Sequence, residues 1–69
     1  MDIRWEEGFE IRTAISGDEA TISANREGLL SLASILRDLA EEAPGTHIHL
    51  DQHNSLEDGS CDLIIERGE

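Results

Sequence analysis

The feature that most constrains this 69-residue chain is a single long stripe of apolar residues at helical spacing. Asn25 is a favourable residue for the start of a helix, and a Pro-Gly pair at residues 44–45 stops it. Between these signals the apolar side chains recur at three- and four-residue steps, at Leu29, Leu32, Ala33, Leu36, Leu39, Ala40 and Ala43. We expect this stripe to face the core, Leu30 and Ile35 to lie at its margins, and Ser31 to lie on the polar surface.

Four runs with the alternation of β-strands flank the predicted helix. Residues 9–16 and 19–24 stand on either side of a Gly-Asp pair at 17–18, which predicts a hairpin. Residues 46–52 and 61–67 follow the helix and enclose a polar loop. This order predicts one α+β domain over residues 1–69, a ββαββ fold whose four-stranded sheet has one helix packed on one face. The other face is left to solvent or a partner.

The alternation also predicts which residues meet in the core. Four helix residues are expected to pack on five strand residues: Leu29, Leu32, Leu36 and Leu39 on Phe9, Ile11, Ile22, Ile48 and Leu50. On this assignment, truncation of Leu36 to alanine should cost roughly 2–5 kcal/mol. A domain this small has little stability to spare, so we expect the substitution largely to unfold it.

The charge is strongly one-sided, with 16 Asp and Glu against 5 Lys plus Arg and a net charge of −11. All five basic residues are arginines. A nucleic-acid binder needs a basic face to neutralise phosphates, and an anionic membrane surface repels an acidic protein. The composition therefore argues against both classes and favours a basic protein partner. No stretch approaches the roughly 18 apolar residues of a membrane span.

The single cysteine and the first residues both predict a cytoplasmic protein. Cys61 has no second cysteine to pair with, and a lone thiol suits a reducing compartment. Residues 1–10 are charged and hold no apolar core of a signal peptide. The flanking residues, Ser60 and Asp62, offer no positive charge that would activate the thiol.

The most distinctive polar pattern occupies every second position of the third strand and its continuation, at His47, His49, Asp51 and His53. The alternate residues Ile48 and Leu50 are core-facing, so the polar set should lie on the open face if the strand runs that far. Imidazoles with a carboxylate are ligands for zinc or another transition metal. The simpler interpretation is a polar contact surface. No catalytic signature surrounds the candidate nucleophiles, and we expect no enzyme activity and no cofactor.

A family resemblance adds a specific role. A helix reading GLLSLASILRDLA, the run HIHLD, a loop with a Leu-Glu step and a terminal apolar strand occur in this order within residues 25–69. This segment resembles immunity protein family 32, one of the small bacterial immunity proteins of polymorphic-toxin systems. The resemblance implies a cytoplasmic protein that binds and neutralises a cognate toxin, without catalysis of its own.

Together these features predict a small acidic immunity protein that binds a basic toxin through its open sheet face and the following loop. The open face is expected to carry Glu10, Arg12, His47, His49 and Asp51. The predicted partner-binding residues are Arg12, His47, His49, Asp51, His53, Glu57 and Asp58. The alternative is a small metal-binding or homo-oligomerising domain that uses the face of His47, His49 and Asp51.

A homodimer is also expected, because one helix over one sheet leaves apolar residues without a partner. These residues are Leu30, Ile35 and one of Leu63, Ile64 and Ile65. An exposed edge strand is a further route to pairing.

Overall fold

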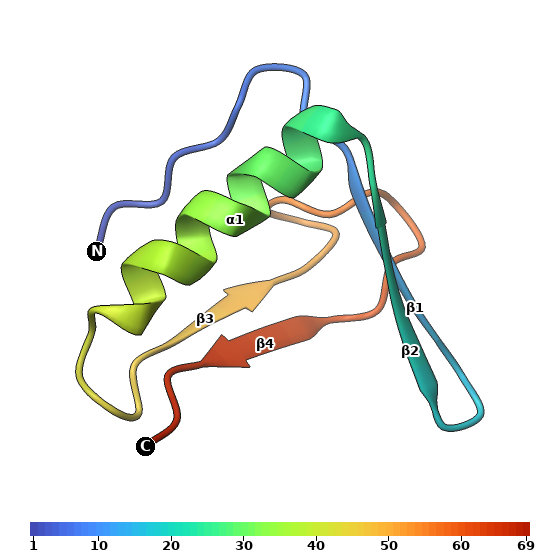
Figure 1. Cartoon of the computed structure of the whole chain (residues 1–69). Coiled ribbons are helices and arrows are strands. Elements are labelled where there is room, and N and C mark those ends of the chain that lie inside the picture. The colour runs from blue at the N-terminus through green and yellow to red at the C-terminus, as the bar shows by residue number, and fades with distance from the viewer.

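The computed structural model describes all residues 1–69 and confirms the ββαββ order of an α+β fold (Figure 1). The elements are β1 (Ile11–Ser16), β2 (Glu19–Ala24), α1 (Arg26–Ala40), β3 (His47–Leu50) and β4 (Leu63–Glu66). The strands form two separate antiparallel sheets of two strands each, β1 with β2 and β3 with β4. The prediction of one four-stranded sheet is therefore wrong.

A loop segment, rather than a third strand, occupies the outer edge of β1. The backbone N–H of Glu57 donates to the Ile11 carbonyl at 2.9 Å, and that of Cys61 donates to the Thr13 carbonyl at 3.3 Å. The Thr13 N–H donates in turn to the Ser60 hydroxyl at 3.1 Å. These bonds satisfy backbone groups that would otherwise pair with a neighbouring strand. The two hairpins are thus joined by the residues that lead into β4.

The β1–β2 hairpin forms as predicted with its turn at Gly17-Asp18, and its register places Ser16 opposite Glu19 across this two-residue turn. Gly17 has φ 61, which suits the first central residue of a type II′ turn. The far half of the hairpin projects away from the helix (Figure 1). Ile15 is consequently 67% exposed and Ile22 48% exposed, so the prediction of Ile22 in the core is wrong.

The helix buries a different side from the one predicted. Its buried residues are Gly28, Ser31, Leu32, Ile35 and Leu39. Leu29 and Leu36 are 55% and 49% exposed, whereas Ile35 is 1% exposed and Ser31 is fully buried. At 100° per residue, the buried side is rotated by roughly 80° from the predicted stripe. Ile35 belongs to the core rather than to its margin.

The core lies between α1, β1 and the β3–β4 hairpin. It is built from Ile11, Leu32, Ile35, Ile48, Leu50 and Leu56, with Trp5, Phe9, Ala24, Leu63 and Ile65 packed against it. The Trp5 and Phe9 rings stack with centroids 4.5 Å apart, which places the N-terminal segment against the same cluster. The predicted core roles of Ile11, Ile48 and Leu50 are confirmed.

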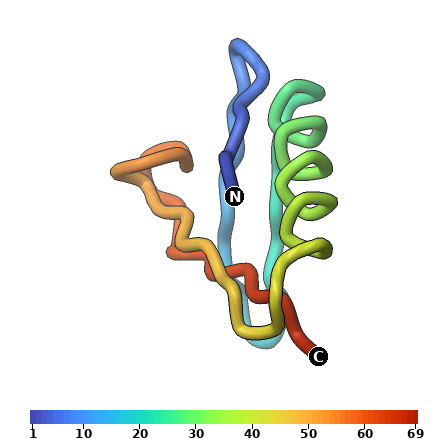
Figure 2. Tube along the Cα trace, turned by 90° about the vertical axis from the view of Figure 1, so that its left-hand side faces the viewer, coloured from blue at the N-terminus to red at the C-terminus, as the bar shows by residue number.

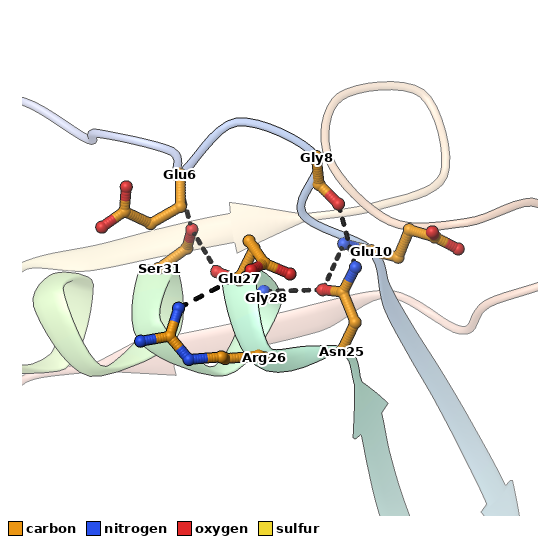
Figure 3. Close-up of polar contacts among 8 residues, drawn as sticks. All are labelled: Glu6, Gly8, Glu10, Asn25, Arg26, Glu27, Gly28 and Ser31. Atoms are coloured by element: carbon orange, nitrogen blue, oxygen red, sulfur yellow. Dashed lines mark hydrogen bonds and ion pairs between the residues drawn. The ribbon is translucent and has the colours of Figure 1, made fainter.

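Asn25 links three segments where the helix begins (Figure 3). Its side-chain oxygen accepts from the N–H groups of Gly28 at 2.8 Å and Glu10 at 2.9 Å, and its amide donates to the Gly8 carbonyl at 2.9 Å. The first bond is the predicted N-cap. The other two tie the chain before β1 to the helix start, a role that helix periodicity does not reveal.

Replacement of Asn25 by alanine should lower the free energy of unfolding by about 2–3 kcal/mol, because it removes a cap and two further hydrogen bonds. Asn25→Asp keeps the accepting oxygen but loses the donor to Gly8. We therefore expect about half the loss for the aspartate variant, measured by urea unfolding. Equal losses for the two variants would contradict the role of the accepting oxygen as the cap.

The other end of the helix stops earlier than the Pro-Gly pair suggests. The last helical residue is Ala40, and its carbonyl accepts from Nε of Arg67 at 3.3 Å. A cationic side chain here also favours the negative end of the helix dipole. The one helix of this chain is not long and apolar enough to cross a membrane.

Candidate interaction site

The loop between β3 and β4, residues 51–61, has its own hydrogen-bonded framework. The Asp51 carbonyl accepts from the N–H groups of Asn54 and Leu56, at 3.2 and 2.9 Å. The Asp51 carboxylate accepts from the His53 N–H at 2.8 Å. Leu56 is 5% exposed and anchors the loop in the core. Half of the other loop residues face solvent, namely Gln52, His53, Asn54, Asp58 and Gly59, so the loop is a partly exposed segment on an apolar anchor.

Contacts with β1 fix the second half of the loop. The Arg12 guanidinium donates through Nη1 to the Asp58 carbonyl at 3.1 Å. The Gly59 N–H donates to Oε1 of Gln52 at 3.0 Å, which closes the loop on itself. Together with the backbone bond from Glu57 to β1, these contacts hold the acidic pair of residues 57–58 in place. A loop fixed in this way loses less conformational entropy when a partner binds.

Three of the predicted binding residues, Arg12, Glu57 and Asp58, lie together at this loop. Arg12 and Glu57 line one small open pocket of about 160 Å³ with Glu10, and Asp58 adjoins the pocket through the bond between its carbonyl and Arg12. We call these four residues, Glu10, Arg12, Glu57 and Asp58, the loop patch. It combines one guanidinium with three carboxylates, a set suited to charged hydrogen bonds with a basic surface.

The histidines form a second patch on the outer face of the β3–β4 hairpin. The rings of His47 and His49 have centroids 5.1 Å apart in an edge-to-face arrangement. Across the sheet they stand opposite Glu66 and Ile64, and all four side chains are exposed. We call these residues, His47, His49, Ile64 and Glu66, the histidine patch. The inward burial of the alternate strand residues confirms the predicted direction of both histidines.

Asp51 and His53 do not share that face. The strand ends at Leu50, and both residues lie in the loop, where the Asp51 carboxylate bonds to the backbone. Arg12 lies on the other sheet. The prediction of one continuous face with Glu10, Arg12, both histidines and Asp51 is therefore wrong. The loop instead connects the end of β3 to the edge of β1, and Figure 2 shows it on the opposite side of the molecule from the helix.

Several residues that build this site carry no obvious sequence signal. Ser60 is buried and accepts from β1, while Gln52 receives the bond that closes the loop. One signal was available, because Leu56 is an isolated apolar residue in a polar segment. Such a residue in a loop is expected to be an anchor to the core.

No group of three His, Cys, Asp or Glu side chains is placed to hold a metal ion. His47 directs Nδ1 to the Gly45 carbonyl at 3.0 Å rather than to a carboxylate. Cys61 is a free thiol whose sulfur donates to the Thr13 hydroxyl at 3.3 Å. The alternative of a metal site on His47, His49 and Asp51 therefore has no preformed ligand set in this fold.

The acidic side chains have almost no internal partners. The one ion pair joins Arg26 to Glu27 at 3.7 Å, and both side chains are exposed. Fifteen of the 16 carboxylates therefore lack a basic partner within 4.0 Å. Uncompensated charge of one sign produces a field that extends beyond the surface and attracts cationic partners.

Comparison with known proteins identifies the family. No curated protein and no solved structure matches this chain. The family model of Immunity protein 32 (Imm32) matches residues 19–68, which is more than half of the chain. The match includes β2 and the helix and continues through the loop and β4. The chain belongs to the Immunity protein 32 family.

Proposed function

We propose that this chain neutralises a cognate toxin by direct binding in the cytoplasm, through the loop patch and the histidine patch. Membership of an immunity protein family supports a toxin as the partner. The two patches offer hydrogen-bonding side chains rather than a catalytic constellation, so the proposed action is steric blocking. The loop, residues 51–61, connects the patches and forms the centre of the binding surface.

The observation that carries this proposal is the attachment of an exposed acidic loop to β1. The side-chain bond from Arg12, the backbone bond to Ile11 and the Leu56 anchor hold the loop in one conformation. Carboxylates held close together repel one another, so this acidic loop lowers the stability of the fold when no partner is bound. It is well suited to a partner that supplies the missing positive charge.

The charge balance supports a basic toxin domain as the partner. With a net charge of −11, the protein attracts a cationic surface before contact and orients it during approach. We expect rising salt to slow association much more than it speeds dissociation, because screening acts on the approach. Stopped-flow measurements across a salt series test this. A dissociation rate that carries most of the salt dependence would contradict steering.

The direct test is protection of cells that express the toxin encoded beside this gene. We expect Glu57→Lys/Asp58→Lys to lose protection and to weaken toxin binding at least tenfold, which corresponds to about 1.4 kcal/mol. Asp18→Lys/Glu19→Lys makes the same charge change at the tip of the β1–β2 hairpin. This control should keep most of the affinity, because it leaves the loop untouched.

The possible outcomes distinguish an error in the proposed binding surface from an error in the proposed function. Equal loss for the loop variant and the hairpin variant would show that net charge, and not the loop, determines binding. His47→Ala/His49→Ala tests the second patch in the same assay. Full protection by both folded patch variants would overturn the proposed surface. Failure of the wild-type protein to protect against the neighbouring toxin would overturn the pairing with that toxin.

Self-association is a second part of the proposal. The sequence predicted a homodimer through Leu30, Ile35 and the apolar run of β4. Ile35 is 1% exposed and is not available to a second copy, so its predicted part in the dimer is wrong. Leu30 is 41% and Ile64 is 57% exposed. Both are available to a second copy, but a larger set of exposed apolar side chains, Ile15, Ile22, Leu29 and Leu36, lies on the β1–β2 hairpin and the helix.

A further inference from the structure

An apolar surface remains uncovered on the β1–β2 hairpin. Ile15 and Ile22 lie on the same face of this hairpin as the buried residues Ile11, which packs with Leu32 and Ile35 of the helix, and Thr13, which bonds to Ser60 and Cys61 of the loop. Their exposed fractions of 67% and 48% arise because the hairpin extends beyond the helix (Figure 1). A two-stranded hairpin is marginally stable by itself in water. We therefore expect the uncovered half of the hairpin to be more stable when another protein surface packs on it.

The helix continues this surface. Leu29 and Leu36, seven residues apart, share one side of α1 and are about half exposed. The opposite side of the helix is covered by the N-terminal segment, where the Glu6 N–H donates to the Ser31 hydroxyl at 2.8 Å. We call Ile15, Ile22, Leu29 and Leu36 the apolar flank.

The outer edge of β2 is unpaired. β2 pairs with β1 alone, and the Asn25 N–H just beyond it donates back to the Glu10 carbonyl at 3.1 Å. Backbone groups alternate in direction along a strand, so Ala20 and Ile22 direct their N–H and C=O groups away from β1. In Figure 2, β1, β2 and the helix follow one another from left to right. The free edge and the helix therefore lie on the same side of the molecule.

We propose that a second copy of this chain pairs with the free edge of β2. The two β2 strands run antiparallel about a twofold axis near Ile22 and form a four-stranded sheet with one β1 at each margin. With the axis at Ile22, the outward backbone groups of Ile22 pair with those of Ile22 in the second copy, and those of Ala20 pair with those of Ala24. The two apolar flanks then lie on the same face of the new sheet.

The charges along β2 favour this occupant. Residues 20–25 are uncharged in a chain in which 30% of residues are charged. Asp18 and Glu19 stand at the start of the strand, and Arg26 follows its end, where its exposed side chain pairs with Glu27 at 3.7 Å within one copy. Antiparallel pairing places the acidic start of each strand beside Arg26 of the other copy, and an exposed ion pair of this length is weak enough to exchange for a contact across the axis. The edge is therefore complementary to itself, as a twofold interface requires.

A basic toxin fits this surface less well. The helix carries no net charge, because Arg26 and Arg37 are balanced by Glu27 and Asp38, and α1 lies on the opposite side of the molecule from the loop, residues 51–61 (Figure 2). A cationic partner is attracted to the loop patch, which leaves the apolar flank free. The dimer is independent of the proposed toxin binding, so either can fail without the other.

Sedimentation equilibrium of the full chain from micromolar to millimolar concentration tests the dimer. Ala20→Pro removes an N–H that points away from β1, so it blocks pairing between copies without breaking the hairpin. We expect the wild type to reach the mass of two chains and Ala20→Pro to remain at the mass of one. Ile22→Ser should raise the dimer dissociation constant at least tenfold, because each copy loses an apolar contact.

The matched control is Ile64→Ser, which removes an isoleucine of similar exposure from the β3–β4 hairpin. It should leave the dissociation constant unchanged. Circular dichroism shows whether each variant is folded. If Ala20→Pro unfolds, the test is the comparison of the dimer dissociation constants of Ile22→Ser and Ile64→Ser. A wild type that stays monomeric, or equal weakening by both serine variants, would overturn the proposal.

Discussion

Replacement of Ile35 by alanine should unfold most of the protein at room temperature. Ile35 is 1% exposed and belongs to the central apolar cluster, so truncation removes buried methyl groups and leaves a cavity. Such substitutions cost about 2–5 kcal/mol. A domain of 69 residues has a total stability of only a few kcal/mol, so this loss approaches the whole.

The neighbouring residue provides the matched control. Leu36 is 49% exposed, and its truncation to alanine should change the free energy of unfolding by less than about 1 kcal/mol. The measurement is thermal unfolding of both variants at low micromolar concentration, where pairing of copies contributes little. If Leu36→Ala lowers the melting temperature as much as Ile35→Ala does, the orientation of the helix described here is wrong.

The contrast between these two residues explains how far the helix could be predicted. Its existence and its first residue follow from the apolar spacing and from Asn25, and both are confirmed. The orientation about its axis does not follow, because apolar residues occupy a wide arc that includes Leu29, Leu36 and Ile35. The small residues Gly28 and Ser31 decide the outcome, since the chain packs closest to the backbone there. A search for apolar residues at helical spacing does not identify Gly28 and Ser31 as core-facing, because neither side chain is large and apolar.

The strands show a similar division. The alternation of residues 19–24 gave β2 with its correct bounds, and the Gly17 turn fixed the register with β1. The arrangement into two sheets could not be predicted, because it depends on the segment beside β1. That segment bonds through Glu57, Ser60 and Cys61 to two residues more than forty positions earlier. No local pattern records such a long-range pairing.

The sequence predicted which residues belong to the candidate site better than it predicted how they are arranged in space. Arg12, Glu57 and Asp58 were selected for charge, and the structure brings them together at one edge of β1. The histidines were selected for alternation, and their outward direction follows from the buried residues between them. The division into two patches arises because β3 ends after Leu50. A strand's length depends on its partner, and β4 offers only four residues to pair with it.

Gly28 is the position where a single methyl group should be most damaging. In a typical helix, replacing glycine by alanine stabilises by about 1 kcal/mol. Here an added Cβ would lie 2.5 Å from the Glu10 carbonyl oxygen and 3.0 Å from side-chain carbons of Ala24 and Ile11. The nearest of these atoms is backbone, held by its bond to the Asn25 N–H, so it cannot move aside without breaking that contact.

We therefore expect Gly28→Ala to destabilise the protein by about 2–3 kcal/mol, since overpacking outweighs the gain in helix propensity. Gly68→Ala is the control, because nothing lies within 4 Å of its added Cβ, and it should leave the melting temperature unchanged. Urea unfolding of both variants gives the comparison. A Gly28→Ala variant that is more stable than the wild type would mean that α1 does not pack closely on β1. In that case Ile11 would lose the cover that buries it completely, and the loop bonded to the other edge of β1 would lose its rigid support.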